Sequence, residues 1–193
     1  AYAVGAVIGL PTFIAALMAV AAAIALTGAA PERASAALAA LLRDFGETHP
    51  PEPRLGAGAI AGIVVSVGLR AVGLLVLDDV WLVIAVLVSA GAVSRATMPV
   101  LAYLIEAAPG EIEDEVPRPS RDGVITAAVL AVVAVLALIE VWAALVGLAA
   151  AALGAAVVAQ LARQRIGGQS VVSLGAAQHL AELAFLVAVI AMR

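Results

Sequence analysis

The chain has 193 residues, of which 65% are hydrophobic and 12% are charged. Soluble domains are about 45–50% apolar and about 25% charged. This chain therefore has too little polar surface to coat a water-soluble globule, which excludes a soluble enzyme. It has no cysteine for a disulfide, a thiol nucleophile or a thiolate metal site. Its net charge of −4 argues against a nucleic-acid-binding protein. The composition indicates an integral membrane protein.

Apolar tracts divide the chain into about six candidate helices, because a spanning helix needs roughly 20 mainly apolar residues. The first tract begins at Ala1 with no basic segment before it, so we expect an N-terminally truncated chain rather than a signal peptide. The tract from Val124 to Leu161 is too long for one span. Glu140 and Trp142 lie near its middle, so we expect two short helices with a tight turn there.

The predicted fold class is all-α: a polytopic transmembrane helical bundle of about six spans with short loops. It forms a single membrane domain over residues 1–193. The expected spans are 2–27, 57–77, 80–104, 124–139, 142–161 and 171–192.

Arginine placement predicts the orientation of these spans. All ten basic residues are arginine. Six spans place seven arginines in the segments on one side of the membrane and only Arg193 on the other. Cytoplasmic loops are enriched in basic residues, so we expect a multi-pass protein of the cell membrane with its arginine-rich loops in the cytoplasm. Trp81 and Trp142 fall at the arginine-poor face, as aromatic belt residues do. The arginine-rich segments are 28–56, 105–122 and 163–170.

Three ionisable side chains fall inside the predicted spans: Arg70, Arg95 and Glu182. A charge at the middle of a membrane helix costs at least about 2.5 kcal/mol, so it usually faces a partner or water. Their similar depths predict that Glu182 lies against Arg95 or Arg70. Such a cluster either locks the bundle as a buried ion pair or binds a substrate anion, since the guanidinium fork suits phosphate. His179, three residues before Glu182 on one helical face, is expected to be a packed hydrogen-bonding side chain rather than a metal ligand.

Four short segments, in chain order, resemble motifs of one enzyme family. The closest begins with Gly167-Gly168-Gln169-Ser170 and runs to Glu182, where the family reads approximately G-G-Q-T-G-D-x-L-G-A and then E-L. Ser94-Arg95-Ala96-Thr97-Met98-Pro99 resembles S/G-R-x-x-M-P, and Arg54-Leu55-Gly56 resembles the end of D-S-R-L-G. Leu26-Thr27-Gly28-Ala29 resembles the segment that leads into an acidic motif. The family is adenosylcobinamide-GDP ribazoletransferase, also called cobalamin-5′-phosphate synthase.

The resemblance implies a transferase that joins adenosylcobinamide-GDP and α-ribazole, or its 5′-phosphate. The products would be adenosylcobalamin, or its 5′-phosphate, and GMP. It implies cobamide precursors as small-molecule substrates, with a homo-oligomer or other cobamide-assembly proteins as further partners in the membrane. The substrate-binding residues carried over from the motifs are Thr27, Gly28, Arg54, Gly56, Ser94, Arg95, Gly168, Gln169, Ser170 and Glu182.

The family also implies Mg²⁺, held by aspartates of its acidic motif. In this chain the three matching positions are Arg33, Ala37 and Ala40, and Val172 replaces the aspartate of T-G-D. Mg²⁺ needs oxygen ligands, which alanine and valine side chains lack. The resemblance therefore leaves the catalytic residues unassigned. The remaining candidate metal ligands, whose spacing matches no strong pattern, are Glu32, Asp44, Glu47 and Glu52.

Three functions stay open on this sequence. The first is an active transferase in which Asp44, Glu47 or Glu52 substitutes as a metal ligand. The second is a catalytically inactive homologue that acts as a binding or scaffold protein in the membrane. The third alternative is a small transporter with ionisable residues along a midplane pathway.

Overall fold

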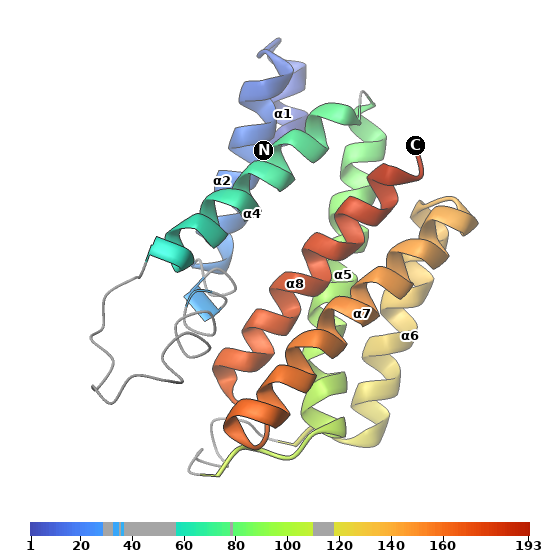
Figure 1. Cartoon of the computed structure of the whole chain (residues 1–193). Coiled ribbons are helices and arrows are strands. Elements are labelled where there is room, and N and C mark those ends of the chain that lie inside the picture. The colour runs from blue at the N-terminus through green and yellow to red at the C-terminus, as the bar shows by residue number, and fades with distance from the viewer. Residues whose placement is uncertain (29–32, 35, 37–56, 78, 110–117) are drawn as a thin grey trace.

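The structure, a computed structural model, describes residues 1–28, 33–34, 36, 57–77, 79–109 and 118–193 (Figure 1). The named elements of this part are all helices, which confirms the predicted all-α class. A single isolated parallel bridge joins Ala107 and Gln169. The helices are α1 (Tyr2–Val7), α2 (Thr12–Thr27), α4 (Ala57–Val76), α5 (Val80–Leu104), α6 (Arg121–Leu138), α7 (Val141–Ile166) and α8 (Val171–Ala191).

Four of these helices, α5 to α8, are long and apolar enough to cross a membrane. Thr12–Thr27 and Gly62–Val76 are shorter apolar helices. Many large apolar side chains on the outside of the bundle are exposed, as expected where the surrounding solvent is lipid. The chain is therefore a multi-pass membrane protein built as a helical bundle.

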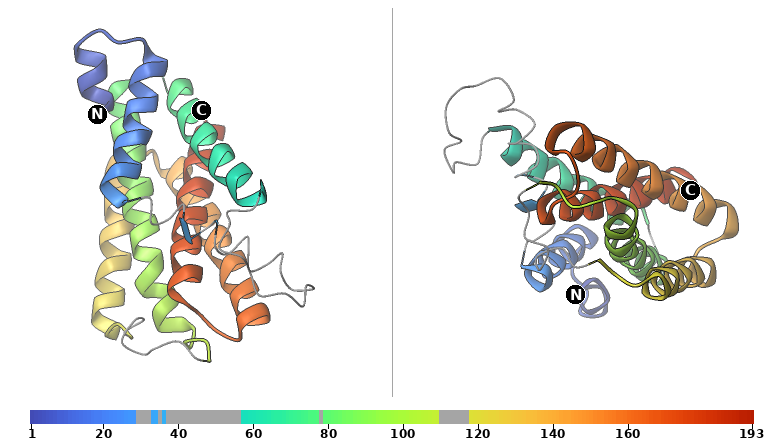
Figure 2. Two further views of the ribbon diagram at one scale, coloured as in Figure 1. Left: turned by 90° about the vertical axis from the view of Figure 1, so that its left-hand side faces the viewer. Right: turned by 90° about the horizontal axis from the view of Figure 1, so that it is seen from below.

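The first predicted span, 2–27, is not one continuous helix. Gly9 adopts a left-handed conformation with φ of +76°, and Pro11 has no amide hydrogen to continue a helix. The chain reverses there, and α1 lies beside α2 (Figure 2). The contact is close, because a Cβ atom added to Gly5 would lie 2.9 Å from the Cβ of Ala15. Only the 16 residues of α2 therefore continue as the first long helix.

Side-chain oxygens fix where four of the long helices begin. Asp79 accepts a hydrogen bond from the amide of Trp81 at the start of α5, and Ser120 accepts one from Gly123 at the start of α6. Glu140 accepts one from Ala143 at the start of α7. Such N-caps satisfy amides that have no partner inside the helix. The turn expected at Glu140 is present, since α6 ends at Leu138 and α7 begins at Val141.

Helix α5 lies at the centre of the bundle and packs against α6 and α8 (Figure 2). Helix α7 packs closely along α8, where Gly147 makes room for the fully buried ring of Phe185. A Cβ at position 147 would lie 2.8 Å from the Phe185 ring. Helix α4 packs on α8, and α2 packs on α4.

The two ends of the bundle differ in charge. At one end α5 and α7 finish and α6 and α8 begin, and this end carries Arg118, Arg121, Arg163 and Arg165 (Figure 1). We call it the arginine-rich end. Trp81 and Trp142, which begin α5 and α7, lie exposed at the opposite end. The structure thus separates these residues along the bundle as the sequence predicts.

Candidate functional site

A polar cluster joins α4 to α8 inside the bundle. Nη2 of Arg70 lies 3.2 Å from Oε2 of Glu182 and 3.3 Å from Nδ1 of His179. Nε2 of His179 lies 2.8 Å from Oγ of Ser66. The side chain of Arg70 is 7% exposed and that of Glu182 is 23% exposed. The predicted contact of Glu182 with an intramembrane arginine is confirmed, and its partner is Arg70.

The hydrogen bonds of His179 follow from the chemistry of its neighbours. A guanidinium group can only donate hydrogen bonds, so Nδ1 of His179 accepts from Arg70. Nε2 then carries the hydrogen and donates it to Oγ of Ser66. Both ring nitrogens are engaged, as expected for a packed hydrogen-bonding side chain and not for a metal ligand.

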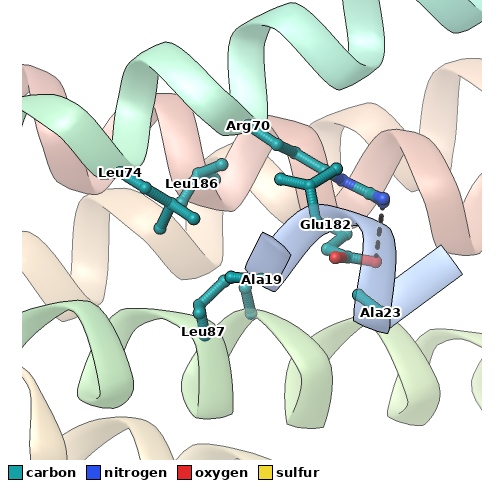
Figure 3. Close-up of a pocket in the computed structure, with 9 residues that line it drawn as sticks. Ala19, Ala23, Arg70, Leu74, Leu87, Glu182 and Leu186 are labelled. Atoms are coloured by element: carbon teal, nitrogen blue, oxygen red, sulfur yellow. Dashed lines mark ion pairs between the residues drawn. The ribbon is translucent and has the colours of Figure 1, made fainter. Parts of the chain in front are cut away.

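A small cavity lies beside the Arg70–Glu182 pair, between α2, α4, α5 and α8 (Figure 3). Its volume is about 30 Å³, room for about one or two water molecules. Ala19 and Ala23 of α2 form part of its wall. This space is too small for a phosphate ester. Among the described residues, the size of this cavity favours the ion-pair lock over a substrate-anion site at Arg70.

Arg95 lies apart from this cluster. Its side chain is exposed, and its Nη1 atom donates to the carbonyl oxygen of Gly91 on its own helix at 3.3 Å. No acidic side chain in the described part of the chain forms an ion pair with it. The neighbouring Ser94 is fully buried and donates its hydroxyl to Gly91 at 3.1 Å. Of these two predicted site residues, only Arg95 presents its side chain outward.

The predicted turn at Gly167–Ser170 is a packed junction between α7 and α8. Gly167 ends α7 with a left-handed φ of +78°. The amide of Gln169 donates to the carbonyl of Glu106 at 2.9 Å, and the amide of Ala108 donates to the carbonyl of Gln169 at 2.8 Å. A Cβ at Gly168 would lie 2.6 Å from the carbonyl oxygen of Glu106, so only glycine allows this approach.

The side chains of the same junction cap two helices. Nε2 of the buried Gln169 donates to the carbonyl of Ala102, in the last turn of α5, at 3.2 Å. Ser170 and Ser173 exchange hydrogen bonds at the start of α8, with Ser170 N to Ser173 Oγ at 2.8 Å and the reverse bond at 3.1 Å. The amides of Gln169 and Ser170 thus donate within the protein.

The segment that resembles the approach to the acidic motif ends α2. The hydroxyl of Thr27 donates to the carbonyl of Ala23 at 3.0 Å, and Gly28 closes the helix in a left-handed conformation with φ of +59°. The guanidinium of Arg33 lies 3.9 Å from where a Cβ of Gly28 would be, over the negative end of the helix dipole. Ala34 packs against Gly175 of α8. A Cβ added to Gly175 would lie 2.6 Å from the Cβ of Ala34.

The described residues do not fit Mg²⁺. They contain no group of three or more histidine, aspartate or glutamate side chains that could hold a metal ion. Glu182 forms an ion pair with Arg70. Arg33 places a positive charge at a position where the family motif has an aspartate. The other expected residues of the site lie outside the described residues: Glu32, Ala37, Ala40, Asp44, Glu47, Glu52, Arg54 and Gly56.

Ser66 is the member of the polar cluster that the sequence interpretation did not assign. A signal was present, because Ser66 and Arg70 are four residues apart on one helix, and His179 and Glu182 are three apart on another. Such spacings place each pair on one helical face. Two polar pairs of matched depth in neighbouring apolar helices indicate a shared cluster.

Comparison with known proteins identifies the family. The family model described as cobalamin-5-phosphate synthase matches residues 51–190, which include the Arg70 cluster, Arg95 and the α7–α8 junction. Neither a curated protein nor a solved structure gives a significant match. Since the matched region covers most of the chain, the chain belongs to the cobalamin-5-phosphate synthase family.

Proposed function

We propose that this chain joins adenosylcobinamide-GDP to α-ribazole, or to its 5′-phosphate, at the arginine-rich end of the bundle. Family membership supports the reaction class. The single structural observation that carries the site is Arg95, an exposed guanidinium within a membrane helix with no described acidic partner. An ionisable residue at this depth indicates a functional site by default. Its planar fork matches phosphate oxygens.

The proposed reaction is a phosphoryl transfer. The ribazole hydroxyl oxygen forms a bond to the β-phosphorus, and the bond from that phosphorus to the bridging oxygen breaks. GMP leaves with the electron pair, and the hydroxyl proton passes to solvent. Such transfers depend mainly on positioning and on neutralising the phosphate charge. The contribution of Arg95 is to bind and orient the diphosphate, roughly 14 Å along α5 from its final residue.

The proposed orientation places the arginine-rich end in the cytoplasm, in line with the enrichment of basic residues in cytoplasmic segments. Nucleotide substrates would then approach Arg95 from that side. Ser94, Gly168, Gln169, Ser170, Thr27 and Gly28 stay predicted site residues from the sequence resemblance. Arg54 and Gly56 stay predicted substrate contacts from the sequence resemblance.

A second candidate function is a binding homologue without catalysis. It is favoured by Arg33 at an expected aspartate position and by the poor fit of the described residues to Mg²⁺. In this alternative the chain binds adenosylcobinamide-GDP through the same arginine and releases no GMP.

One experiment separates the two functions. The purified full chain is placed in lipid nanodiscs with adenosylcobinamide-GDP and α-ribazole, with Mg²⁺ or with EDTA, and GMP is measured by chromatography. Binding of adenosylcobinamide-GDP alone is measured by calorimetry. GMP release together with cobamide formation supports the transferase. Saturable binding without GMP release supports the binding homologue. If adenosylcobinamide-GDP does not bind, with Mg²⁺ or with EDTA, both proposed functions are overturned.

A further inference from the structure

A second, larger cavity lies between α5, α6 and α7. Its volume is about 420 Å³, far larger than the cavity beside Arg70. Alanines line the cavity on all three helices, such as Ala96, Ala128 and Ala152, and their small side chains leave the space between the helices unfilled. Thr97 carries the one hydroxyl among the lining side chains, and it donates to the carbonyl of Val93 at 3.0 Å. The lining offers nothing to hold water or a polar ligand.

The geometry of the helices opens this groove toward the arginine-rich end. Helices α6 and α7 meet at the Ile139–Glu140 turn and diverge toward their other ends (Figure 1). On α5 the groove runs from Val93 to Leu104, the half of the helix nearest the arginine-rich end. Since these helices cross the membrane, the groove faces the acyl chains of one leaflet.

Two arginines, Arg163 and Arg121, belong to the end of the bundle toward which the groove opens. Nη2 of Arg163 donates to the carbonyl of Leu104 at 3.3 Å, and Leu104 lines the groove. Arg121 begins α6, two turns before Ala128 in the groove wall, and its side chain is exposed. Arginine binds phosphate oxygens through its planar fork. The apolar groove and the guanidinium of Arg163 beside Leu104 thus match the tail and the phosphate of one lipid.

We propose that this groove is a binding site for a glycerophospholipid from the leaflet at the arginine-rich end. One acyl chain fills the space between α5, α6 and α7, and the headgroup phosphate lies at Arg163. The lipid completes the packing of α6, whose side chains are mostly exposed along its length. This site is separate from Arg95. Val93 and Thr97 line the groove, and Arg95 is two residues from each of them, a rotation of about 200° around the axis of α5.

The test uses native mass spectrometry of the full chain in detergent. The probes are palmitoyl-oleoyl phosphatidylglycerol and palmitoyl-oleoyl glycerol, which has the same tails and no phosphate. Ala152→Phe fills the groove, and its control Leu153→Phe changes the next residue, which is 68% exposed and outside the groove. Arg163→Gln removes the proposed phosphate contact, with Arg193→Gln at the opposite end as its control.

We expect Ala152→Phe to weaken binding of both probes about tenfold, the loss of about two methylene contacts. Leu153→Phe should bind like the parent. Arg163→Gln should weaken phosphatidylglycerol about fivefold and leave the phosphate-free probe unchanged. If Ala152→Phe fails to fold, Ala128→Phe fills the groove from the opposite wall. The proposal is overturned if the groove variants bind as the parent does, if Leu153→Phe loses binding equally, or if the groove proves to be covered by a second copy of the chain.

Discussion

Arg70 and Glu182 meet across the interface of α4 and α8, with 3.2 Å between Nη2 and Oε2. The two residues are far apart in the sequence, and the ion pair fixes the depth of one helix against the other. Removing one charge breaks this ion pair and leaves the other charge buried, which is more costly than removing both.

We expect Glu182→Leu to lower the free energy of unfolding by about 2–3 kcal/mol. The double variant Arg70→Met with Glu182→Leu should recover at least half of that loss, because neither charge of the pair stays buried. Reversible unfolding in mixed detergent micelles measures both, as a double-mutant cycle with the two single variants. Additive losses would contradict a direct coupling between these side chains.

Ser66 and Ser89 offer a matched pair of buried hydroxyls. Ser66 accepts from Nε2 of His179, whereas Oγ of Ser89 has no hydrogen-bond partner among the described residues. We expect Ser66→Ala to cost about 1 kcal/mol of unfolding free energy, while Ser89→Ala is neutral or stabilising. Nitrogen-15 NMR of His179 should show the Nε2–H tautomer in the parent. A protonated Nδ1 would overturn the assigned hydrogen bonds.

Gly168 should tolerate no side chain. In Gly168→Ala the new Cβ would approach two backbone atoms, the carbonyl oxygen of Glu106 at 2.6 Å and the amide nitrogen of Ala108 at 2.7 Å. Since neither can rotate away, we expect a loss of about 2–3 kcal/mol in thermal or denaturant unfolding. Gly68→Ala in α4 is the control, because no atom lies within 4 Å of its added Cβ. That change should be neutral or stabilising by up to about 1 kcal/mol.

Arg95 should matter for ligand binding and little for stability. We expect Arg95→Gln to weaken binding of adenosylcobinamide-GDP at least about tenfold, the usual scale for a lost charged phosphate contact. Arg95→Lys should restore part of the affinity, because the charge returns without the planar fork. Calorimetry measures the binding, and unfolding of the same variants measures stability. A large stability loss with unchanged binding would assign Arg95 a structural role.

Restoring carboxylates at the expected metal positions should introduce metal binding. We expect the parent to bind Mn²⁺ weakly, as followed by electron paramagnetic resonance, because Arg33 repels a cation and alanines follow it. The triple variant Arg33→Asp, Ala37→Asp and Ala40→Asp should bind it at least about tenfold more tightly. Tight binding by the parent that disappears in Asp44→Ala, Glu47→Ala or Glu52→Ala would instead place the metal on those side chains.

The helices were predictable because apolar length and capping residues are local properties of the sequence. The turn at Glu140 followed from a carboxylate in the middle of an overlong apolar tract. The break at Gly9 and Pro11 was missed because apolar content alone continues through both residues. Depth along the helices predicted that Glu182 meets an arginine but not which one, since rotation about a helix axis depends on packing.

The candidate site was harder to predict than the helices. Sequence resemblance grouped Ser94 with Arg95, yet consecutive helical residues point about 100° apart, and only Arg95 is exposed. The family resemblance implies that Gly168, Gln169 and Ser170 bind substrate, and a glycine-rich turn at a helix start can offer amides to an anion. The bridge to residues 106–108 and the Ser170–Ser173 exchange use these amides instead, and neither contact is visible in local sequence.

The junction of Gly168 and Gln169 also bears on how such sequences are recognised. Its glutamine satisfies a backbone carbonyl in the last turn of α5, and its glycine allows residues 106–108 to approach closely. This requirement persists whether or not the bundle performs chemistry. A motif built on these two residues therefore diagnoses the architecture of a membrane protein. Whether that protein is a working enzyme has to be judged from the exposed guanidinium of Arg95 and from the carboxylates of Glu32, Asp44, Glu47 and Glu52.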